Sequence, residues 1–297
     1  MGRVLTYRAD VSGQTVKRFL YAHGYTSSVI TMLKKSERGI MLGGERVFVD
    51  RVLSAGDVLE ISLDEPLDDI LKAKESYPPQ QLGFTVLFED EDIIAYDKPP
   101  LVAVHPTKKI QSGTLANDFA YHLQQRGEAG VFRLVYRLDR GTSGVVIAAK
   151  NKLACALLSG KTSKRYLCVC VGELPEKGTF DGNIGLSESS TLKRAVRPDG
   201  QTAVTHFDCL CSANGLSLAR VTLETGRTHQ IRVHFSHAGF PLLGDFLYGE
   251  ESALISRHAL HCETAEFTHP ITGEKIALTS PLPNDISSVC EKYNLFG

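Results

Sequence analysis

The amino-acid sequence predicts an α+β protein with a small N-terminal α/β domain and a larger domain of strands and helices. Residues 1–63 combine helical apolar spacing with short strand-like runs, and residues 64–81 are rich in acids and prolines. The remainder alternates between strand-like and helix-like segments. At 297 residues, the chain is long enough for one small and one large domain.

The first 63 residues are predicted to form two helices and a small set of strands. Apolar residues at helical spacing mark residues 16–20 and 29–33. Residues 40–49 have the pattern of two short strands about a Gly-Gly turn, and residues 58–61 that of another strand. Residues 64–81 are interpreted as a linker, because acids and prolines do not favour a packed element.

The larger domain is predicted from apolar patterning along residues 82–297. Apolar residues at helical spacing predict a helix at 114–125 and another around 153–157. A polar run predicts a loop or hairpin tip at 187–202. Strand-like runs lie at 86–88, 93–96, 145–149, 164–171, 221–235, 264–267 and 275–278. Within 221–235, alternation would place Gln230, Arg232 and His234 on one face, and Ile231, Val233 and Phe235 on the other.

A single acid, Asp139, stands in a cation-rich stretch before the apolar run at 145–149. Between residues 131 and 170 there are eight Lys or Arg and one carboxylate. We expect that carboxylate to be ionised, because nearby cations favour the charged form. The Gly-Thr-Ser-Gly turn that follows should hold it at the entrance to a rigid strand, where an ionised carboxylate can act as a nucleophile. The alternative is that Asp139 caps this turn through its side chain.

Charge is distributed unevenly along the chain. The formal net charge is −1, yet the segment from residue 64 to 92 carries nine acids and two lysines, which leaves the middle of the chain basic. A basic strip on a neutral protein can still contact phosphates, so the total charge does not exclude RNA as a partner.

Three blocks of the chain, together with this order of elements, resemble RluA-type pseudouridine synthases, which isomerise uridines in ribosomal or transfer RNA. The blocks are residues 93–106, Arg-Leu-Asp-Arg-Gly-Thr-Ser-Gly at 137–144, and Thr-Gly-Arg-Thr-His-Gln-Ile-Arg-Val-His at 225–234. Gly-Asp at 244–245 and Tyr-Gly at 248–249 support them. The resemblance implies a mixed, mostly antiparallel sheet with flanking helices. Residues 1–63 resemble an RNA-binding module of the ribosomal protein S-four type.

The resemblance assigns roles to particular residues. Asp139 matches the catalytic aspartate and Arg232 the basic residue paired with it. Tyr166 matches the tyrosine that stacks on the target base, and Arg137 the arginine that replaces the extruded uridine in the RNA helix. Further RNA contacts are expected from Arg140, Lys164, Arg227, His229, Gln230, Lys34 and Lys35.

The resemblance and the composition together set the expected partners. Structured RNA is the expected substrate, and the isomerisation requires no cofactor. Seven cysteines in a chain of this length are expected to be reduced thiols rather than disulfides. The pairs Cys168/Cys170 and Cys209/Cys211 have strand spacing, so we expect buried thiols and no metal site. No apolar run approaches the length of a membrane span, and the first residues lack the apolar core of a secretion signal, so a cytoplasmic location is expected. The protein is also expected to be a monomer.

Two other functions were weighed. A hydrolase would use Ser143 and His229 with Asp139, but the spacing around Ser143 is not that of a nucleophile elbow. The other alternative is an RNA-binding protein that has the synthase fold and no activity.

Overall fold

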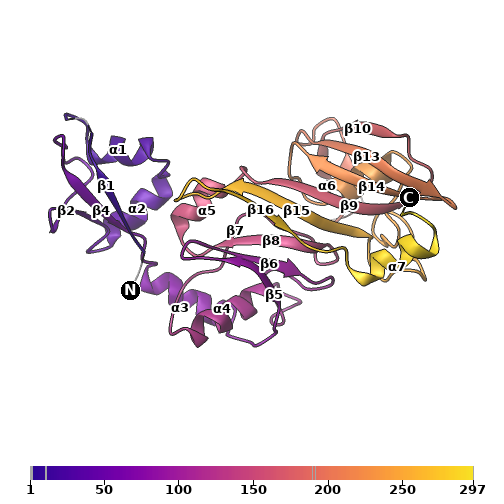
Figure 1. Cartoon of the computed structure of the whole chain (residues 1–297), viewed down its shortest axis with the longest axis horizontal. Helices are drawn as coiled ribbons and strands as arrows, with labels where there is room; N and C mark the ends of the chain where they lie inside the picture. Colours follow the sequence, from indigo (N-terminus) through magenta and orange to yellow (C-terminus); the bar gives the residue numbers. More distant parts are fainter. Residues whose placement is uncertain (1–2, 11, 189, 191, 297) are drawn as a thin grey trace.

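The computed structural model describes residues 3–10, 12–188, 190 and 192–296. A small N-terminal domain lies at one end of a larger domain built on a ten-stranded sheet (Figure 1). None of the helices within these ranges is both long and apolar enough to cross a membrane.

The N-terminal domain is an antiparallel sheet of order β1-β4-β2-β3 with two helices. Its elements are β1 (Val4–Arg8), α1 (Val16–Ala22), α2 (Ser27–Lys35), β2 (Ile40–Leu42), β3 (Glu45–Arg46) and β4 (Val58–Ser62). Thr15 and Thr26 cap the two helices through their side chains. The predicted helices and the strands at 40–49 and 58–61 are confirmed, and β1 is an additional strand.

The composition of segment 64–81 predicted a linker without a packed element, and this prediction is wrong. The segment contains α3 (Leu67–Ser76). The acids Asp68 and Asp69 lie in the first turn, where the helix dipole favours negative charge, and the prolines lie outside the helix. Tyr77 follows the helix and is buried, and its hydroxyl accepts a hydrogen bond from a backbone amide of the larger domain. The segment is therefore anchored.

The larger domain has the predicted mixed, mostly antiparallel sheet. Its strands follow the order β10-β13-β14-β9-β15-β8-β6-β5, with β16 beside β15 and β7 beside β8, and only the β15–β8 pair is parallel among the described strands. Its first elements are β5 (Thr85–Glu89), β6 (Ile93–Lys98), α4 (Leu115–Gln125), β7 (Arg133–Leu134), β8 (Ser143–Ala149), α5 (Lys152–Leu158), β9 (Ser163–Val171) and β10 (Lys177–Asp181). The others are β11 (Ile184–Leu186), β12 (Arg194–Val196), β13 (Val204–Ala213), β14 (Leu216–Leu223), α6 (Gln230–His237), β15 (Leu260–Thr268), β16 (Lys275–Thr279) and α7 (Asn284–Lys292).

The predicted loop or hairpin tip at 187–202 is occupied by the β11–β12 hairpin and its flanks. Positions 189 and 191 of that segment lie outside the described residues.

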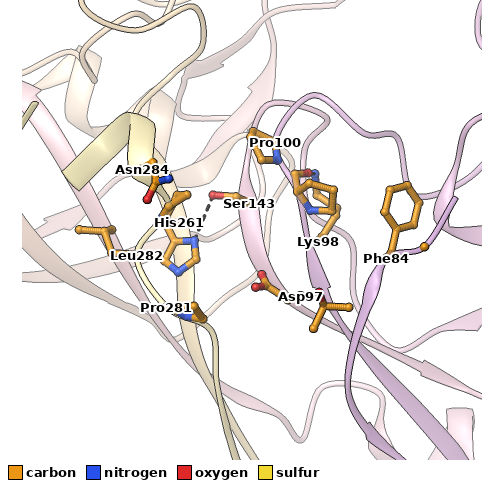
Figure 2. Close-up of a pocket in the computed structure, with 13 residues that line it drawn as sticks. Phe84, Asp97, Lys98, Pro100, Ser143, His261, Pro281, Leu282 and Asn284 are labelled. Atoms are coloured by element: carbon orange, nitrogen blue, oxygen red, sulfur yellow. Dashed lines mark hydrogen bonds between the residues drawn. The ribbon is translucent and has the colours of Figure 1, made fainter. Parts of the chain in front are cut away.

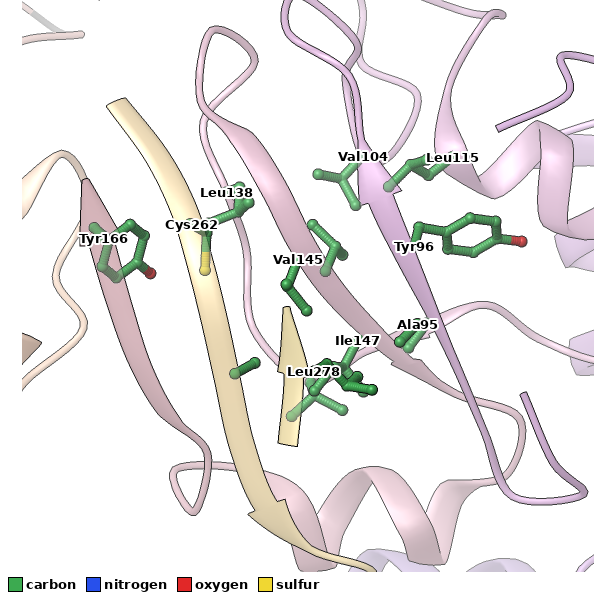
Figure 3. Close-up of a cluster of buried hydrophobic side chains, with 14 of the residues drawn as sticks. Ala95, Tyr96, Val104, Leu115, Leu138, Val145, Ile147, Tyr166, Cys262 and Leu278 are labelled. Atoms are coloured by element: carbon green, nitrogen blue, oxygen red, sulfur yellow. The ribbon is translucent and has the colours of Figure 1, made fainter. Parts of the chain in front are cut away.

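Strand β8 is the centre of the large core (Figure 3). All seven of its residues are buried, because it lies between β6 and β15 in the middle of the sheet. Val145 and Ile147 pack near Leu278 and Cys262, and Tyr96 of β6 continues the cluster towards α4. This rigid strand begins four residues after Asp139 and therefore fixes the position of the loop that carries it.

Helix α5 lies beside the N-terminal domain (Figure 1), and side chains of both domains pack in one cluster there. Leu153 of α5 is fully buried in the core of the N-terminal domain, and Leu157 packs against the same cluster. Arg3 forms ion pairs with Glu91 and Asp92 of the larger domain. The N-terminal domain is thus docked through both apolar and charged contacts.

We expect Leu153→Ala to loosen this docking. The truncation leaves a cavity in the N-terminal core, so it should lower the free energy of unfolding by ~2–5 kcal/mol. Urea denaturation gives that change, and limited proteolysis should cut the protein faster between the domains. Leu71→Ala, at an exposed position of α3, is the control. A midpoint and cleavage rate equal to those of the wild type would show that Leu153 does not hold the domains together.

Candidate active site

Asp139 lies in the loop that leads into β8. The loop closes with a hydrogen bond from the Thr142 amide to the Asp139 backbone carbonyl, 3.1 Å. Gly144 has φ 108°, and a Cβ there would lie 2.1 Å from the Cys262 carbonyl oxygen of the parallel neighbour β15. At Gly141, φ is not positive, and a side chain is excluded by the ring of His258 instead. Both glycines therefore allow close packing around the loop, as expected.

The Asp139 carboxylate meets Arg232 rather than the amides of its own turn. The Arg232 Nη1 donates to Asp139 Oδ2 at 3.1 Å. On its other side, Arg232 makes a bidentate pair with Asp245, with Nε–Oδ2 and Nη2–Oδ1 distances of 2.7 Å each. The side chain of Asp245 is 0% exposed, that of Arg232 is 5% exposed and that of Asp139 is 26% exposed. Arg232 is therefore held in place by the buried Asp245, while the Asp139 carboxylate remains accessible.

This pairing keeps both buried groups charged. Burial opposes the charge of Asp245, but the hydrogen bonds from Arg232 outweigh it and lower the pKa of Asp245. Burial likewise opposes the charge of Arg232, and the two carboxylates outweigh it and raise the pKa of Arg232. Arg232 thus presents a permanent positive charge to Asp139.

The backbone that carries Arg232 is helical, which corrects the strand predicted over 221–235. Strand β14 ends at Leu223, and α6 begins after His229, whose backbone is left-handed with φ 60°. Ile231 and Phe235 are four residues apart, so a helix also places them on one face, against the core. Strand alternation would add Val233 to that face, but the helix places Val233 in a separate cluster with Ile184 and Ala203, and the turn at 225–229 decides between the two.

His229 completes the surroundings of Asp139. Its Nδ1 lies 2.7 Å from the Tyr248 hydroxyl, which also accepts a hydrogen bond from the Arg194 amide at 2.8 Å. The hydroxyl has one proton, and donating it to His229 Nδ1 would place the proton of a neutral ring on Nε2. Nε2 is 3.7 Å from Asp139 Oδ1. Burial lowers the pKa of His229, which favours this neutral form.

One cavity of about 60 Å³ joins most of the predicted site residues. It is lined by Arg137, Leu138, Asp139, Thr142, Tyr166, Leu223, Arg227, His229, Gln230, Ile231, Arg232 and Leu260. The Tyr166 ring is 5% exposed, and burial raises the pKa of its hydroxyl well above the usual value, so Tyr166 stays neutral. Arg137 is exposed.

The remaining predicted residues do not line this cavity. Lys164 lies with its ammonium 4.4 Å from the centre of the Tyr136 ring, and the Arg140 Nε donates to the Leu101 carbonyl. Lys34 and Lys35 are exposed in the last turn of α2, in the N-terminal domain. Gln230 reaches the cavity, but its amide also holds the turn together through Val204, Thr205, Thr225 and Arg227.

The structure adds residues for which sequence reasoning gave no role. Asp245 and Tyr248 were noted as supporting motif residues, but their contacts with Arg232 and His229 depend on tertiary structure. Two buried cations hold the backbone beside Asp139, since Lys98 Nζ donates to the Arg140 carbonyl at 3.1 Å and Arg257 Nη1 to the Gly141 carbonyl at 2.8 Å. Burial lowers the pKa of Lys98 to about 7. No local sequence pattern indicates these contacts.

The hydrolase alternative requires a contact between Ser143 and His229, and Ser143 instead contacts another histidine. Its hydroxyl is 3.0 Å from His261 Nδ1, on a separate cavity of about 490 Å³ (Figure 2). His261 Nε2 faces the Ser280 carbonyl at 3.1 Å, so Nδ1 accepts the Ser143 proton. Ser143 and His261 are 2% and 1% exposed. Because this pair packs away from Asp139, the three residues form no catalytic triad.

Metal-ligating side chains come together at one place among the described residues, namely Asp90, Asp92 and His269. Their atoms already have protein partners. Asp92 accepts from Asn151 and Arg3, His269 Nδ1 accepts from two backbone amides, and Asp90 pairs with His269 Nε2. Of the three residues, Asp92 also contacts the N-terminal domain, through its ion pair with Arg3. Within the described ranges, the cysteines belong to no such group.

Buried histidines should make the protein sensitive to acid. Burial lowers the pKa of five of them, which are His105, His229, His234, His258 and His261, and that of His258 falls to about 3. Between the unfolded pKa near 6.5 and the lower folded value, the unfolded chain binds more protons. Stability should therefore fall as the pH drops below about 6.5, by up to ~1.4 kcal/mol per pH unit for each such histidine.

Thermal unfolding at pH 7.5, 6 and 5 tests this expectation. The His258→Gln protein keeps a partner for Thr142 and should show a shallower loss of melting temperature. An identical pH dependence in both proteins would show that His258 does not contribute.

Comparisons with known proteins give consistent findings. A family model described as RNA pseudouridylate synthase matches residues 92–237. The "Uncharacterized RNA pseudouridine synthase YjbO" of Bacillus subtilis is 37% identical over 286 residues, which cover 94% of this chain and 99% of that relative. The "Ribosomal large subunit pseudouridine synthase D" of Xanthomonas campestris is 36% identical over 268 residues, which cover 83% and 78%. The structure of "Human RNA Pseudouridylate Synthase Domain Containing 1" matches with a TM-score of 0.56 and 22% identity over 69% of this chain and 85% of that one, which shows the shared fold.

Proposed function

Because the chain belongs to the RluA-type RNA pseudouridine synthase family, we propose that it isomerises specific uridines of ribosomal RNA with Asp139 as the reacting carboxylate. Members of this family are isomerases. The names of two relatives that are 36% and 35% identical favour the large ribosomal subunit as the source of the substrate over transfer RNA. The rival function is RNA binding without catalysis.

The observation that carries the proposal is the partly exposed carboxylate of Asp139 beside the buried Arg232. The reaction breaks the bond between the ribose and the base nitrogen, turns the base and joins its carbon five to the ribose. Carbon five releases its proton to water, and the freed nitrogen takes up a proton. Atoms balance without a cofactor. Asp139 can attack the ribose, assist elimination or attack the base ring, and each route needs an ionised carboxylate at this position.

The target uridine has to leave the RNA stack to reach Asp139. The cavity of about 60 Å³ holds a few waters rather than a nucleotide, so lining side chains must move when RNA binds. Extruding a base costs on the order of a few kcal/mol. Stacking on Tyr166 would return ~1–3 kcal/mol, and Arg137 at the cavity would fill the vacated place in the RNA.

Release of tritium from RNA labelled at carbon five of uridine tests the function. We expect release from unmodified large-subunit ribosomal RNA, and pseudouridine maps of cells with and without the protein should differ at the same uridine. A protein that binds this RNA without releasing tritium would support the non-catalytic alternative.

Residues 1–63 are proposed to be an RNA-binding module, with 64–81 as the connection and 82–297 as the catalytic domain. The exposed Lys34 and Lys35 end α2 and offer two positive charges to phosphates. Deleting the module would uncover Leu153 in α5, so point substitutions give a cleaner test than the deletion does.

We expect the Lys34→Gln/Lys35→Gln protein to bind RNA more weakly and with less dependence on salt. Loss of two phosphate contacts should reduce the slope of log Kd against log salt by ~1.4. The Lys72→Gln/Lys74→Gln protein, changed at exposed positions of α3, is the matched control. Equal affinity and slope in both proteins would exclude α2 from the RNA interface.

A further inference from the structure

A second cavity adjoins the site and shares one residue with it. This cavity of about 330 Å³ lies at the β11–β12 hairpin and is lined by Ile184, Gly185, Leu186, Arg194, Asp199, Gly200, Gln201, Arg227 and Thr228. Arg227 also lines the cavity that contains Asp139. A polymer that places its reacting unit in the cavity with Asp139 therefore places a neighbouring unit at the second cavity.

Arg194 is poised for a ligand that the protein does not itself supply. Its Nε is buried and has no hydrogen-bond partner among the described residues. Such an orphaned donor is costly unless a ligand or water satisfies it. Arg227 uses its Nε on the Thr202 carbonyl at 3.0 Å, which fixes the direction of an exposed guanidinium.

The charge in this cavity favours an anion. Arg194 and Arg227 bring two positive charges, while Asp199 is the single acid among the lining residues. Asp199 is already paired with Arg197, through Nε–Oδ1 at 2.5 Å and Nη2–Oδ2 at 2.9 Å. Planar guanidinium groups of this kind recognise phosphate oxygens in pairs.

The hairpin is joined to the centre of the site by hydrogen bonds. The Arg194 backbone amide donates to the Tyr248 hydroxyl, and that hydroxyl shares a hydrogen bond with Nδ1 of His229, which faces Asp139. The charge of Arg194 also reaches His229, since it adds to burial in lowering the pKa of that ring. The backbone that carries Arg194 is therefore held in place relative to the Asp139 carboxylate.

We infer that the second cavity binds one backbone phosphate of the RNA, next to the target uridine, between the guanidinium groups of Arg194 and Arg227. This inference rests on the proposed function, because it takes RNA as the substrate. The phosphate would fix which nucleotide stands before Asp139, so the subsite sets the register of the RNA rather than the chemistry.

The salt dependence of RNA binding tests the subsite without requiring turnover. The probe is a fluorescein-labelled RNA stem-loop with uridines in its loop, titrated over a range of KCl concentrations with full-length proteins that all carry Asp139→Asn. Arg194→Met and Arg227→Met should each lower the slope of log Kd against log salt by ~0.7, the value for one phosphate of single-stranded RNA. The double variant should lower it by the same amount, because both groups hold one phosphate.

Two further variants complete the design. Arg194→Lys keeps the charge and should restore most of the slope. Arg126→Met removes an exposed arginine at the end of α4, outside both cavities, and should leave the slope unchanged. Unchanged slopes in both single variants, a change in one of them alone, or a double-variant change twice as large would each overturn the shared phosphate. A failure of the proposed function would appear instead as absent tritium release from the protein that retains Asp139, whatever the slopes of the Asp139→Asn proteins.

Discussion

The Asp139→Asn protein is expected to release no measurable tritium from labelled RNA, with turnover reduced by at least ~10³-fold. Asparagine keeps the shape of the side chain and an oxygen that can accept from Arg232, so the fold and the cavity should persist. What it lacks is the negatively charged oxygen that the proposed chemistry requires. Turnover is measured by tritium release, and RNA affinity by fluorescence titration.

RNA binding should be retained in the Asp139→Asn protein, since phosphate and stacking contacts involve other residues. Asp208→Asn, at an exposed position of β13, is the control for loss of one negative charge and should turn over normally. Equal tritium release from the wild type and Asp139→Asn would rule out Asp139 as the reacting group.

Removing Arg232 is expected to have two separable effects. Arg232→Met leaves the fully buried Asp245 without its counter-charge, which should cost ~3–5 kcal/mol of stability. It also takes the positive charge from Asp139, which should lower turnover by ~10²-fold or more. Urea denaturation and tritium release measure the two effects.

A compensating substitution distinguishes them. In Arg232→Met/Asp245→Asn the buried group is neutral, and its oxygen can still accept from the amides of Leu247 and Tyr248. Stability should recover in large part, while turnover should stay low. Recovery of both would mean that Arg232 serves only to neutralise Asp245.

Sequence patterns were sufficient where an element is decided locally or by burial on both faces. The run at 145–149 is apolar throughout because β8 is covered on both sides, and that signal led to Asp139. Pairing of Asp139 with Arg232 was expected from the family resemblance, and the 3.1 Å contact now shows it.

Sequence patterns gave the wrong element where only a few residues distinguish strand alternation from helical spacing. Ile231, Val233 and Phe235 suit a strand, yet His229 turns the chain and α6 follows. The acids of 64–81 indicated a linker, although two of them stabilise the start of α3. The contacts of Lys98 and Arg257 beside Asp139 could not be predicted, because their partners there are backbone carbonyl oxygens, which every residue offers.

The position of Leu153 also has a consequence for biosynthesis. Proteins leave the ribosome from the N-terminus, and domains generally fold as they emerge. Here the leading domain lacks one of its own interior side chains until α5 has been translated. Complete folding of the N-terminal domain therefore has to wait for the synthesis of α5. A nascent chain arrested before that helix would carry a weakly folded N-terminal domain with an incompletely filled core.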